Sequence, residues 1–300
     1  MSVFTQSQIK SHDSNDKEEH DRLSYQHEAI KLAVGGNYKA PISQLNEGKG
    51  PLNILDVCSG SGQWVLEMAH EFPEAKVYGI DVSKPAAKPQ NTSPSNAWFV
   101  IRDIRLPFEE CSFDVVHMRM VPSIQERETI YKDIHRVLRP GGLILLVEPG
   151  ERVSHTGADL PPELVAMTNA VVGTRHFQEI KYPAPDRART GSQENAWAMA
   201  TKIGEGIRKS PSMWAKVEEV KLAIPIGDWA DDDIGQRAGK LLRYCIPGLF
   251  KAMRPAIVDE GILSGEQMDD LLGKLDIVFG PEAARWKIEW PFCLVWAEKI

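Results

Sequence analysis

The sequence has few cysteines, and no two of them stand at a metal-binding or redox spacing. The 4 cysteines are scattered, which predicts reduced thiols in an intracellular protein and argues against a disulfide framework or a zinc site. The N-terminus lacks the apolar segment of a secretory signal. The longest apolar run, Leu143 to Val147, is far shorter than the roughly 20 residues that span a bilayer. We therefore expect a soluble, cytoplasmic protein with no metal centre and no membrane partner.

The sequence also lacks the excess of positive charge that is typical of nucleic-acid-binding proteins. It has 35 Lys and Arg against 42 Asp and Glu, a net charge of -7. Binding to a phosphate backbone normally needs a basic face, so we expect no nucleic-acid partner, although a local basic patch could exist within this total. The 42% hydrophobic and 26% charged content is that of an ordinary globular protein.

Short apolar runs alternate with helical patterns along most of the chain. This alternation predicts βαβ units and an α/β fold, with a Rossmann-like, seven-stranded, mostly parallel sheet that has helices on both faces. The expected strands are residues 52–56, 76–81, 98–101, 113–118, 143–147, 221–226 and 286–297.

The chain divides by composition into a tail and one domain. Residues 1–21 are polar and predict a flexible N-terminal tail, and residues 22–300 predict a single domain. This domain has a core at 52–150, a helical substrate or lid insertion at 151–219, and C-terminal strands and helices at 220–300. The expected helices outside the core include 23–34, 163–172, 194–207, 213–220 and one that Ser264-x-x-Gln267 begins with a capping box. Trp197, Met199, Met213 and Trp214 could line a cavity, although ordinary helix packing also explains them.

A glycine turn follows the first strand. That strand passes Asp56 and runs into Cys58-Ser59-Gly60-Ser61-Gly62, after which a helix begins. Glycines allow a sharp turn and a close approach of backbone N–H groups, and a helix N-terminus favours negative charge. The segment therefore predicts a nucleotide-type binding corner. A dinucleotide fingerprint would have a third glycine where Val65 stands, which disfavours a nicotinamide-dependent oxidoreductase.

This corner and later segments resemble the class I S-adenosylmethionine (SAM) methyltransferases. The matching segments are 54–62, Gly79-Ile80-Asp81, Asp103-Ile104 before Leu106-Pro107-Phe108, 112–116 and 137–143. A narrower resemblance to fungal LaeA-like methyltransferases of secondary metabolism lies in Asp21-Arg22-Leu23-x-x-Gln26-His27, Trp64 and 224–229. It implies methyl transfer from SAM to a small natural-product-like acceptor, with O- or N-methylation favoured and S-adenosylhomocysteine (SAH) as product. The resemblance to LaeA also implies an alternative function, as a nuclear regulator that works with protein partners.

The resemblance also implies a set of cofactor-binding residues. Around the turn these are Cys58, Ser59, Gly60 and Gly62 for the carboxylate end of SAM, with Trp64 beside them. Further along, Asp81 would accept from both ribose hydroxyls, and Val82 follows it in the cofactor-binding set. Asp103 would accept from the adenine amino group, and Ile104 would pack on the ring. Asp56 could orient the turn or reach the ammonium group through water. His117 and Met118 would lie beside the sulfonium, and the N-terminal helix with Tyr25, Gln26 and His27 could close over the cofactor.

Cys58 stands where the family has its first glycine, and we expect a β-like φ there with the thiol packed under the cofactor. The candidate catalytic residues are His117, whose strand end should face the cofactor crevice, and Glu148, which ends the next strand. His155 and His176 are weaker candidates. A satisfied core or surface residue explains each of these side chains at least as well.

Overall fold

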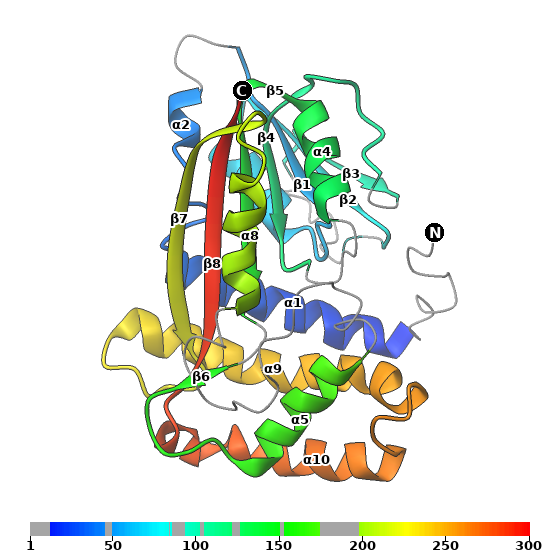
Figure 1. Ribbon diagram of the computed structural model, residues 1–300, viewed down its shortest axis with the longest axis vertical. Coiled ribbons are helices and arrows are strands. Elements are labelled where there is room, and N and C mark those ends of the chain that lie inside the picture. Colours follow the sequence, from blue (N-terminus) through cyan, green and yellow to red (C-terminus); the bar gives the residue numbers. More distant parts are fainter. Residues whose placement is uncertain are drawn as a thin grey trace.

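A single sheet lies at the centre of the part of the chain that the structure, a computed structural model, describes: residues 13–45, 50–83, 85, 94–102, 105–121, 127–150, 153–174 and 198–300. Its 8 strands have the order β3-β2-β1-β4-β5-β8-β6, and β7 also pairs with β8 (Figure 1). They are β1 (Asn53–Val57), β2 (Lys76–Asp81), β3 (Ala97–Ile101), β4 (Phe113–Arg119), β5 (Leu138–Pro149), β6 (Ser154–His155), β7 (Trp214–Pro225) and β8 (Ile288–Lys299).

The first 5 strands are mutually parallel, whereas β8 runs antiparallel to β5, β6 and β7. Residues 54–57 of β1 are all buried, as expected for a parallel strand whose two faces are both covered. The carboxyl ends of β1, β2 and β4 meet at one edge of the sheet, which is where open α/β folds bind ligands. The predicted α/β fold with a mostly parallel sheet is therefore confirmed.

Two helical layers cover the sheet, and a third group of helices lies beyond its carboxyl edge. The helices are α1 (Asp13–Val34), α2 (Ile42–Leu45), α3 (Gln63–Glu71), α4 (Arg127–Val137), α5 (Pro162–Gly173), α8 (Ala198–Arg208), α9 (Asp233–Asp259), α10 (Gly265–Val278) and the 3₁₀ turn η1 (Pro281–Arg285). Alternate strand residues face the two layers: Leu145 packs with the residues of α2 and α3, and Leu146 with those of α4 and α8.

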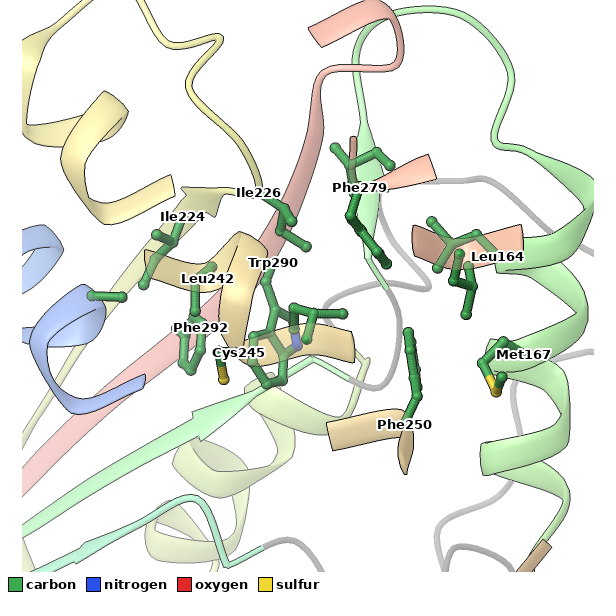
Figure 2. Close-up of a cluster of buried hydrophobic side chains, with 14 of the residues drawn as sticks. Leu164, Met167, Ile224, Ile226, Leu242, Cys245, Phe250, Phe279, Trp290 and Phe292 are labelled. Carbon is green, nitrogen blue, oxygen red and sulfur yellow. The ribbon is translucent and has the colours of Figure 1, made fainter. Parts of the chain in front are cut away.

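The third group of helices forms its own apolar core against the ends of β7 and β8. In Figure 1, α1 runs across the molecule between the carboxyl end of the parallel strands and α9. Figure 2 shows this core, in which Met167 of α5 and Phe250 of α9 gather near Trp290 of β8. Of these helices, α1 reaches the glycine turn, where Leu23 Cδ1 would lie 3.7 Å from a Cβ added to Gly60.

Two details of the predicted sheet and insertion differ from the structure. All 7 predicted strands are present, but the two-residue β6 makes the sheet eight-stranded. The helix expected at 213–220 is wrong, because Trp214–Pro225 is the strand β7. Ser210 begins only a single turn, since the amides of Met213 and Trp214 both donate to its carbonyl. The long strand β8 then supplies a hydrogen-bonding partner, and tertiary pairing overrides the local helical pattern.

The N-terminal helix begins earlier than the sequence indicates. The expected flexible tail reaches residue 21, yet α1 already begins at Asp13; residues 1–12 lie outside the described part. Arg22 explains the longer helix: its Nη1 donates to Gln26 Oε1 at 2.8 Å and lies 3.7 Å from Cys245 Sγ of α9. These buried contacts attach the polar start of α1 to the helical cover.

One other local prediction is confirmed. Ser264 and Gln267 form the predicted capping box at the start of α10. The 4 cysteines are free thiols. Within the described ranges, no helix has the length and apolar character needed to cross a membrane. The division of the chain into tail, core and insertion otherwise stays a prediction.

Candidate active site

The glycine turn after β1 has a left-handed backbone at 3 positions, with φ of +60° at Cys58, +52° at Gly60 and +79° at Gly62. The β-like φ expected at Cys58 is therefore wrong. The amide of Ser59 donates to the Ile80 carbonyl at 3.1 Å, which ties the turn to β2 directly after Cys58. The chain must therefore reverse at Cys58, and a residue with a Cβ carries about 1–3 kcal/mol of strain in that conformation.

Gly62 is required by packing as well as by conformation. It is the N-cap of α3. A Cβ at this position would lie 2.7 Å from Cε1 of Phe99 on β3 and 3.0 Å from Cβ of Pro85. The N-terminus of α3 is thus held close against β3, with its backbone directed toward the turn.

Asp81 at the end of β2 holds the turn in place. Its Oδ2 accepts from the Gly60 amide at 2.8 Å, and its Oδ1 accepts from the Ser83 amide at 3.0 Å and the Ser83 hydroxyl at 2.8 Å. A carboxylate has sites for about four hydrogen bonds, so Asp81 retains capacity for a further donor. Val82, the next residue, is 45% exposed and lies open beside it.

Asp56 and His117 form a buried pair on the adjacent strands β1 and β4. The two residues are register partners, and His117 Nδ1 lies 2.7 Å from Asp56 Oδ1. The indole of Trp64 stacks on the imidazole with a centroid distance of 4.0 Å and an interplanar angle of 12°. Its Nε1 donates to the Asn37 carbonyl at 3.0 Å. The ring of His117 is therefore fixed in both position and tilt.

The protonation of His117 follows from these surroundings. Burial lowers the pKa of His117, while the charge of Asp56 and the hydrogen bond to it raise the pKa in part, so that the net direction is downward. The neutral imidazole donates from Nδ1 to the Asp56 carboxylate, which leaves Nε2 as an acceptor. His117 also lines a narrow cleft.

Arg119, two residues further along β4, joins the same face of the sheet. Its Nη2 lies 2.7 Å from Nδ1 of His27 on α1. On the other side of that ring, His27 Nε2 lies 3.1 Å from Glu67 Oε1 on α3, and Lys31 Nζ lies 2.8 Å from Glu67 Oε2. Burial lowers the pKa of His27, as does the charge of Arg119, so its ring is neutral and accepts from the guanidinium. This chain of contacts joins α1, α3 and β4.

A narrow cleft lies between α1 and the sheet beside these polar groups. Its floor is formed by β4, β5 and β8, and its rim by α1 and the segment that follows it. Most of its lining is apolar, and includes Ile30, Val34, Leu145, Val147, Leu294 and Trp296. His117 and Arg119 bring the polar groups of β4 into the cleft. The residues of the glycine turn and Asp81 are not part of its lining.

The structure separates several residues that the sequence places together. Because His117 pairs with Leu145 and Met118 with Leu146, the two side chains point to opposite faces of the sheet. Glu148 shares the face of Met118, is 1% exposed, and accepts at Oε1 from the Val121 amide at 3.1 Å. The candidate catalytic residues His117 and Glu148 therefore do not lie on one face, and their roles stay predictions.

The remaining predicted residues are spread around the site. Tyr25 is 43% exposed on α1 and its ring lies 6.0 Å from that of Tyr244. Gln26 is buried and accepts from Arg22. His155 is on the edge strand β6. Asp103, Ile104 and His176 lie outside the described residues, as do Trp197 and the side chain of Met199.

Sequence reasoning did not assign a role to Arg119 or Glu67, and it named His27 only in a motif and in the helix that could close over the cofactor. One signal was available for Arg119: in a strand it shares a face with His117 two positions earlier. No local pattern pairs Arg119 with His27 or Glu67, because these residues come from three different elements.

Part of the chain is similar to known methyltransferases. Residues 54–142 match the family described as "Methyltransferase domain". The N-methyltransferase verN of Clonostachys rogersoniana is 37% identical over 150 residues, which cover 47% of this chain and 51% of verN. The secondary metabolism regulator LAE1 of Cochliobolus heterostrophus is 31% identical over 153 residues, which cover 49% of this chain and 48% of LAE1. The matches thus span about half the length of each of these relatives.

A solved structure of phosphoethanolamine N-methyltransferase 2 from Haemonchus contortus aligns with a TM-score of 0.45 and 18% identity, over 90% of this chain and 56% of that one. Residues 54–142 therefore match a methyltransferase domain, and the sheet order and the glycine turn around them agree with the predicted resemblance to the class I type. The chain resembles fungal LaeA-like proteins and fungal N-methyltransferases.

Proposed function

We propose that the protein transfers a methyl group from SAM to a small natural-product-like acceptor, at oxygen or nitrogen, and releases SAH. The observation that carries this proposal is the contact of Asp81 with the Gly60 amide, inside a stretch that matches a methyltransferase domain. This hydrogen bond holds the glycine turn next to Asp81, at the carboxyl edge of the parallel sheet. The Asp81 carboxylate can still accept a further hydrogen bond. Similarity to verN, an N-methyltransferase, supports the transfer to nitrogen.

The described residues fit this cofactor. A Cβ added to Gly60 would have Leu23 Cδ1 as its nearest neighbour, at 3.7 Å, so close packing does not block the turn on that side. Asp81 would hold the ribose through its remaining acceptor capacity, and the turn with the N-terminus of α3 would hold the carboxylate. When bound, the cofactor supplies a methyl group that its sulfonium already activates. The protein then has to align the acceptor, exclude water and, for some acceptors, remove a proton.

His117 is suited to remove that proton. Asp56 fixes the tautomer in which Nε2 accepts, and Trp64 holds the ring in place. The competing interpretation is that His117 only satisfies Asp56 within the core. A His117→Gln variant separates these two interpretations. If His117 is the base, the substitution lowers kcat by about 10²–10⁴-fold and changes the affinity for SAH little. An unchanged kcat would leave His117 as a core residue, and Glu148→Gln can be measured in the same way.

The cofactor assignment is tested by thermal unfolding of the full chain with SAM, SAH or NAD. A ligand at 100-fold above its Kd adds about 2.7 kcal/mol to the free energy of unfolding, which raises Tm measurably. We expect stabilisation by SAM and SAH and none by NAD. Stabilisation by NAD alone would contradict the proposal and favour an oxidoreductase. Acceptors can then be sought as metabolites that gain one methyl group when incubated with SAM and the protein.

A second function is favoured by the similarity to LAE1, which is a regulator of secondary metabolism. In that role the domain would act through protein partners, in the nucleus rather than the cytoplasm. A stable, specific complex with a regulatory protein, together with no turnover of any metabolite, would favour the regulator. Turnover of a small acceptor without such a complex would favour the enzyme.

A further inference from the structure

One stripe of α1 faces the glycine turn and the helix α3 that follows it. Leu23, His27 and Lys31 are spaced by four residues, which places them one above the other on the same face of the helix. A Cβ added to Gly60 would lie 3.7 Å from Leu23 Cδ1, and Lys31 Nζ lies 2.8 Å from Glu67 Oε2 of α3. His27 stands between these two and is 2% exposed. This turn-facing stripe therefore runs along the corner that we assign to the cofactor.

A second set of contacts holds α1 on α9 and β7. Arg22 and Gln26 are both buried, and they lie 3.7 and 3.6 Å from Sγ of Cys245 on α9. Burial raises the pKa of that thiol, so it is neutral. Ile30 packs in the apolar core that also holds Ile224 of β7. None of these side chains changes its charge between about pH 5 and 8, so this set of contacts is independent of acid in that range.

The two ring nitrogens of His27 need different partners. A guanidinium can only donate, so the contact of Arg119 Nη2 with His27 Nδ1, at 2.7 Å, requires Nδ1 to be an acceptor. The proton of the neutral ring is then on Nε2, which lies 3.1 Å from Glu67 Oε1. A second proton, on Nδ1, would replace the acceptor with a donor and place a charged ring against the guanidinium. Protonation of His27 therefore breaks its contact with β4.

The groups around His27 favour the neutral ring. Burial lowers the pKa of His27 most, and the charges of Arg119 on β4 and Lys31 on α1 lower it further. The contact with Glu67 on α3 raises the pKa in part, and the net direction is downward. At neutral pH the ring therefore holds the contact with Arg119, and acid adds the proton that breaks it.

We infer that His27 is a positioning residue of the cofactor site: its neutral ring holds the turn-facing stripe of α1 against the glycine turn, and its protonation loosens that stripe and weakens cofactor binding. Because Leu23 lies one helical turn from His27 on the same stripe, a shift of α1 at His27 also moves Leu23 away from Gly60. The inference rests on the proposed function, which assigns the glycine turn to SAM.

The test is calorimetric titration of SAH into the full-length chain at about pH 8 and about pH 5, on the two sides of ordinary histidine titration. His27→Gln keeps an acceptor for Arg119 and a donor for Glu67 but does not titrate. His27→Leu has neither group. His70→Gln is the matched control, because His70 is an exposed histidine on α3. Thermal unfolding at each pH reports whether each variant is folded.

We expect acid to weaken SAH binding at least about fivefold more in the wild type and His70→Gln than in His27→Gln, in which His117 still titrates. At about pH 8, His27→Gln should bind as the wild type does, and His27→Leu at least about fivefold more weakly. The same response to acid in His27→Gln and the wild type would overturn the inference, as would wild-type affinity in His27→Leu. If His27→Leu does not fold, the comparison with His27→Gln decides alone.

Amide hydrogen exchange tests the same contact without a ligand. After correction for intrinsic rates, residues 23–31 should lose protection in acid in the wild type and keep it in His27→Gln, because opening is then local to the stripe. Equal protection in the two chains would overturn the inference. Failure of the wild-type chain to bind SAH at either pH would instead contradict the proposed function, and hydrogen exchange would still decide whether His27 holds α1.

Discussion

The Nδ1 atom of His117 lies 2.7 Å from Oδ1 of Asp56, across two register-paired parallel strands and beneath the indole of Trp64. The pair joins the strand that leads into the glycine turn to the strand that ends in Arg119. Both side chains are almost completely buried, at 4% and 2% exposure for Asp56 and His117. Asp56, the acidic residue before the glycine turn, therefore orients the ring of His117 in addition to any effect that it has on the turn.

Replacing Asp56 with Asn tests this relationship. The change keeps the shape but removes the charged acceptor, and hydrogen bonds to charged groups contribute about 1.5–3 kcal/mol. We expect Asp56→Asn to lower the free energy of unfolding by about 2 kcal/mol in urea titrations. In the proposed enzyme it should also lower kcat more than it raises the Kd for SAH, because the tautomer of His117 is no longer fixed. Unchanged stability would contradict a role for the pair in the fold.

Cys58 is the residue whose backbone conformation fits its type least well. Removing its Cβ should relieve the left-handed φ of +60°, whereas alanine keeps the strain and loses the thiol. We expect Cys58→Gly to be more stable than Cys58→Ala by about 1 kcal/mol in chemical denaturation. Cys58→Gly should also retain cofactor binding by calorimetry. An alanine variant as stable as the glycine variant would contradict the strain assigned to this position. A glycine variant that no longer binds the cofactor would show that the side chain itself is needed.

Glu67 gives the structure a pH-dependent contact between α1 and α3. Burial acts to raise the pKa of Glu67, but the contacts with His27 and Lys31 outweigh it and lower the pKa to about 2. A carboxyl group with a depressed pKa in the folded state stabilises the fold above its unfolded value, and this stabilisation is lost as pH falls toward the folded value. We therefore expect Glu67→Gln to cost about 2 kcal/mol at pH 7 and progressively less between about pH 4.5 and 2.

Urea midpoints of wild type and Glu67→Gln across that pH range measure the effect. Glu74→Gln is the control, because Glu74 is an exposed glutamate in the turn after α3. If the difference in free energy of unfolding between wild type and Glu67→Gln does not decrease as the pH falls, the ionic contact of Glu67 with Lys31 and His27 is contradicted. His27 and His117 contribute a separate loss below about pH 6.5, because burial lowers both pKa values and the unfolded chain then binds the protons more readily. The loss that comes from His117 is common to both chains. The loss that comes from His27 is larger in Glu67→Gln, because the contact with Glu67 partly offsets the lowering of the His27 pKa by burial.

The sheet and the glycine turn could be predicted from the sequence because their signals are local. Ile54 and Leu55 form a short apolar run before the turn, and Ser264 with Gln267 caps its helix within one turn. The helix expected at 213–220 failed for the opposite reason. Residues from Trp214 onward pair with β8, which is more than 60 residues distant in sequence and provides a ladder that no local pattern reveals.

The polar part of the site was predictable only in fragments. His117 was found from its place at a strand end, but its partner could not be inferred without the register of β1 and β4. The contact between Arg119 and His27 joins residues 92 positions apart. Met118 was placed beside His117 although the alternation of a strand puts them on opposite faces, a physical rule that the sequence already contained.

The most direct test of the cofactor site is calorimetric titration of SAH into the wild-type chain and an Asp81→Ala variant. Asp81 holds the Gly60 amide at 2.8 Å and retains capacity for the ribose, so its removal affects both the turn and the ligand. Asp228→Ala, at a carboxylate after β7, serves as the control. We predict saturable SAH binding by the wild type and the control, and at least a tenfold weaker Kd for Asp81→Ala. Absence of SAH binding by the wild type, or equal affinity in Asp81→Ala, would contradict the assignment of this corner to SAM.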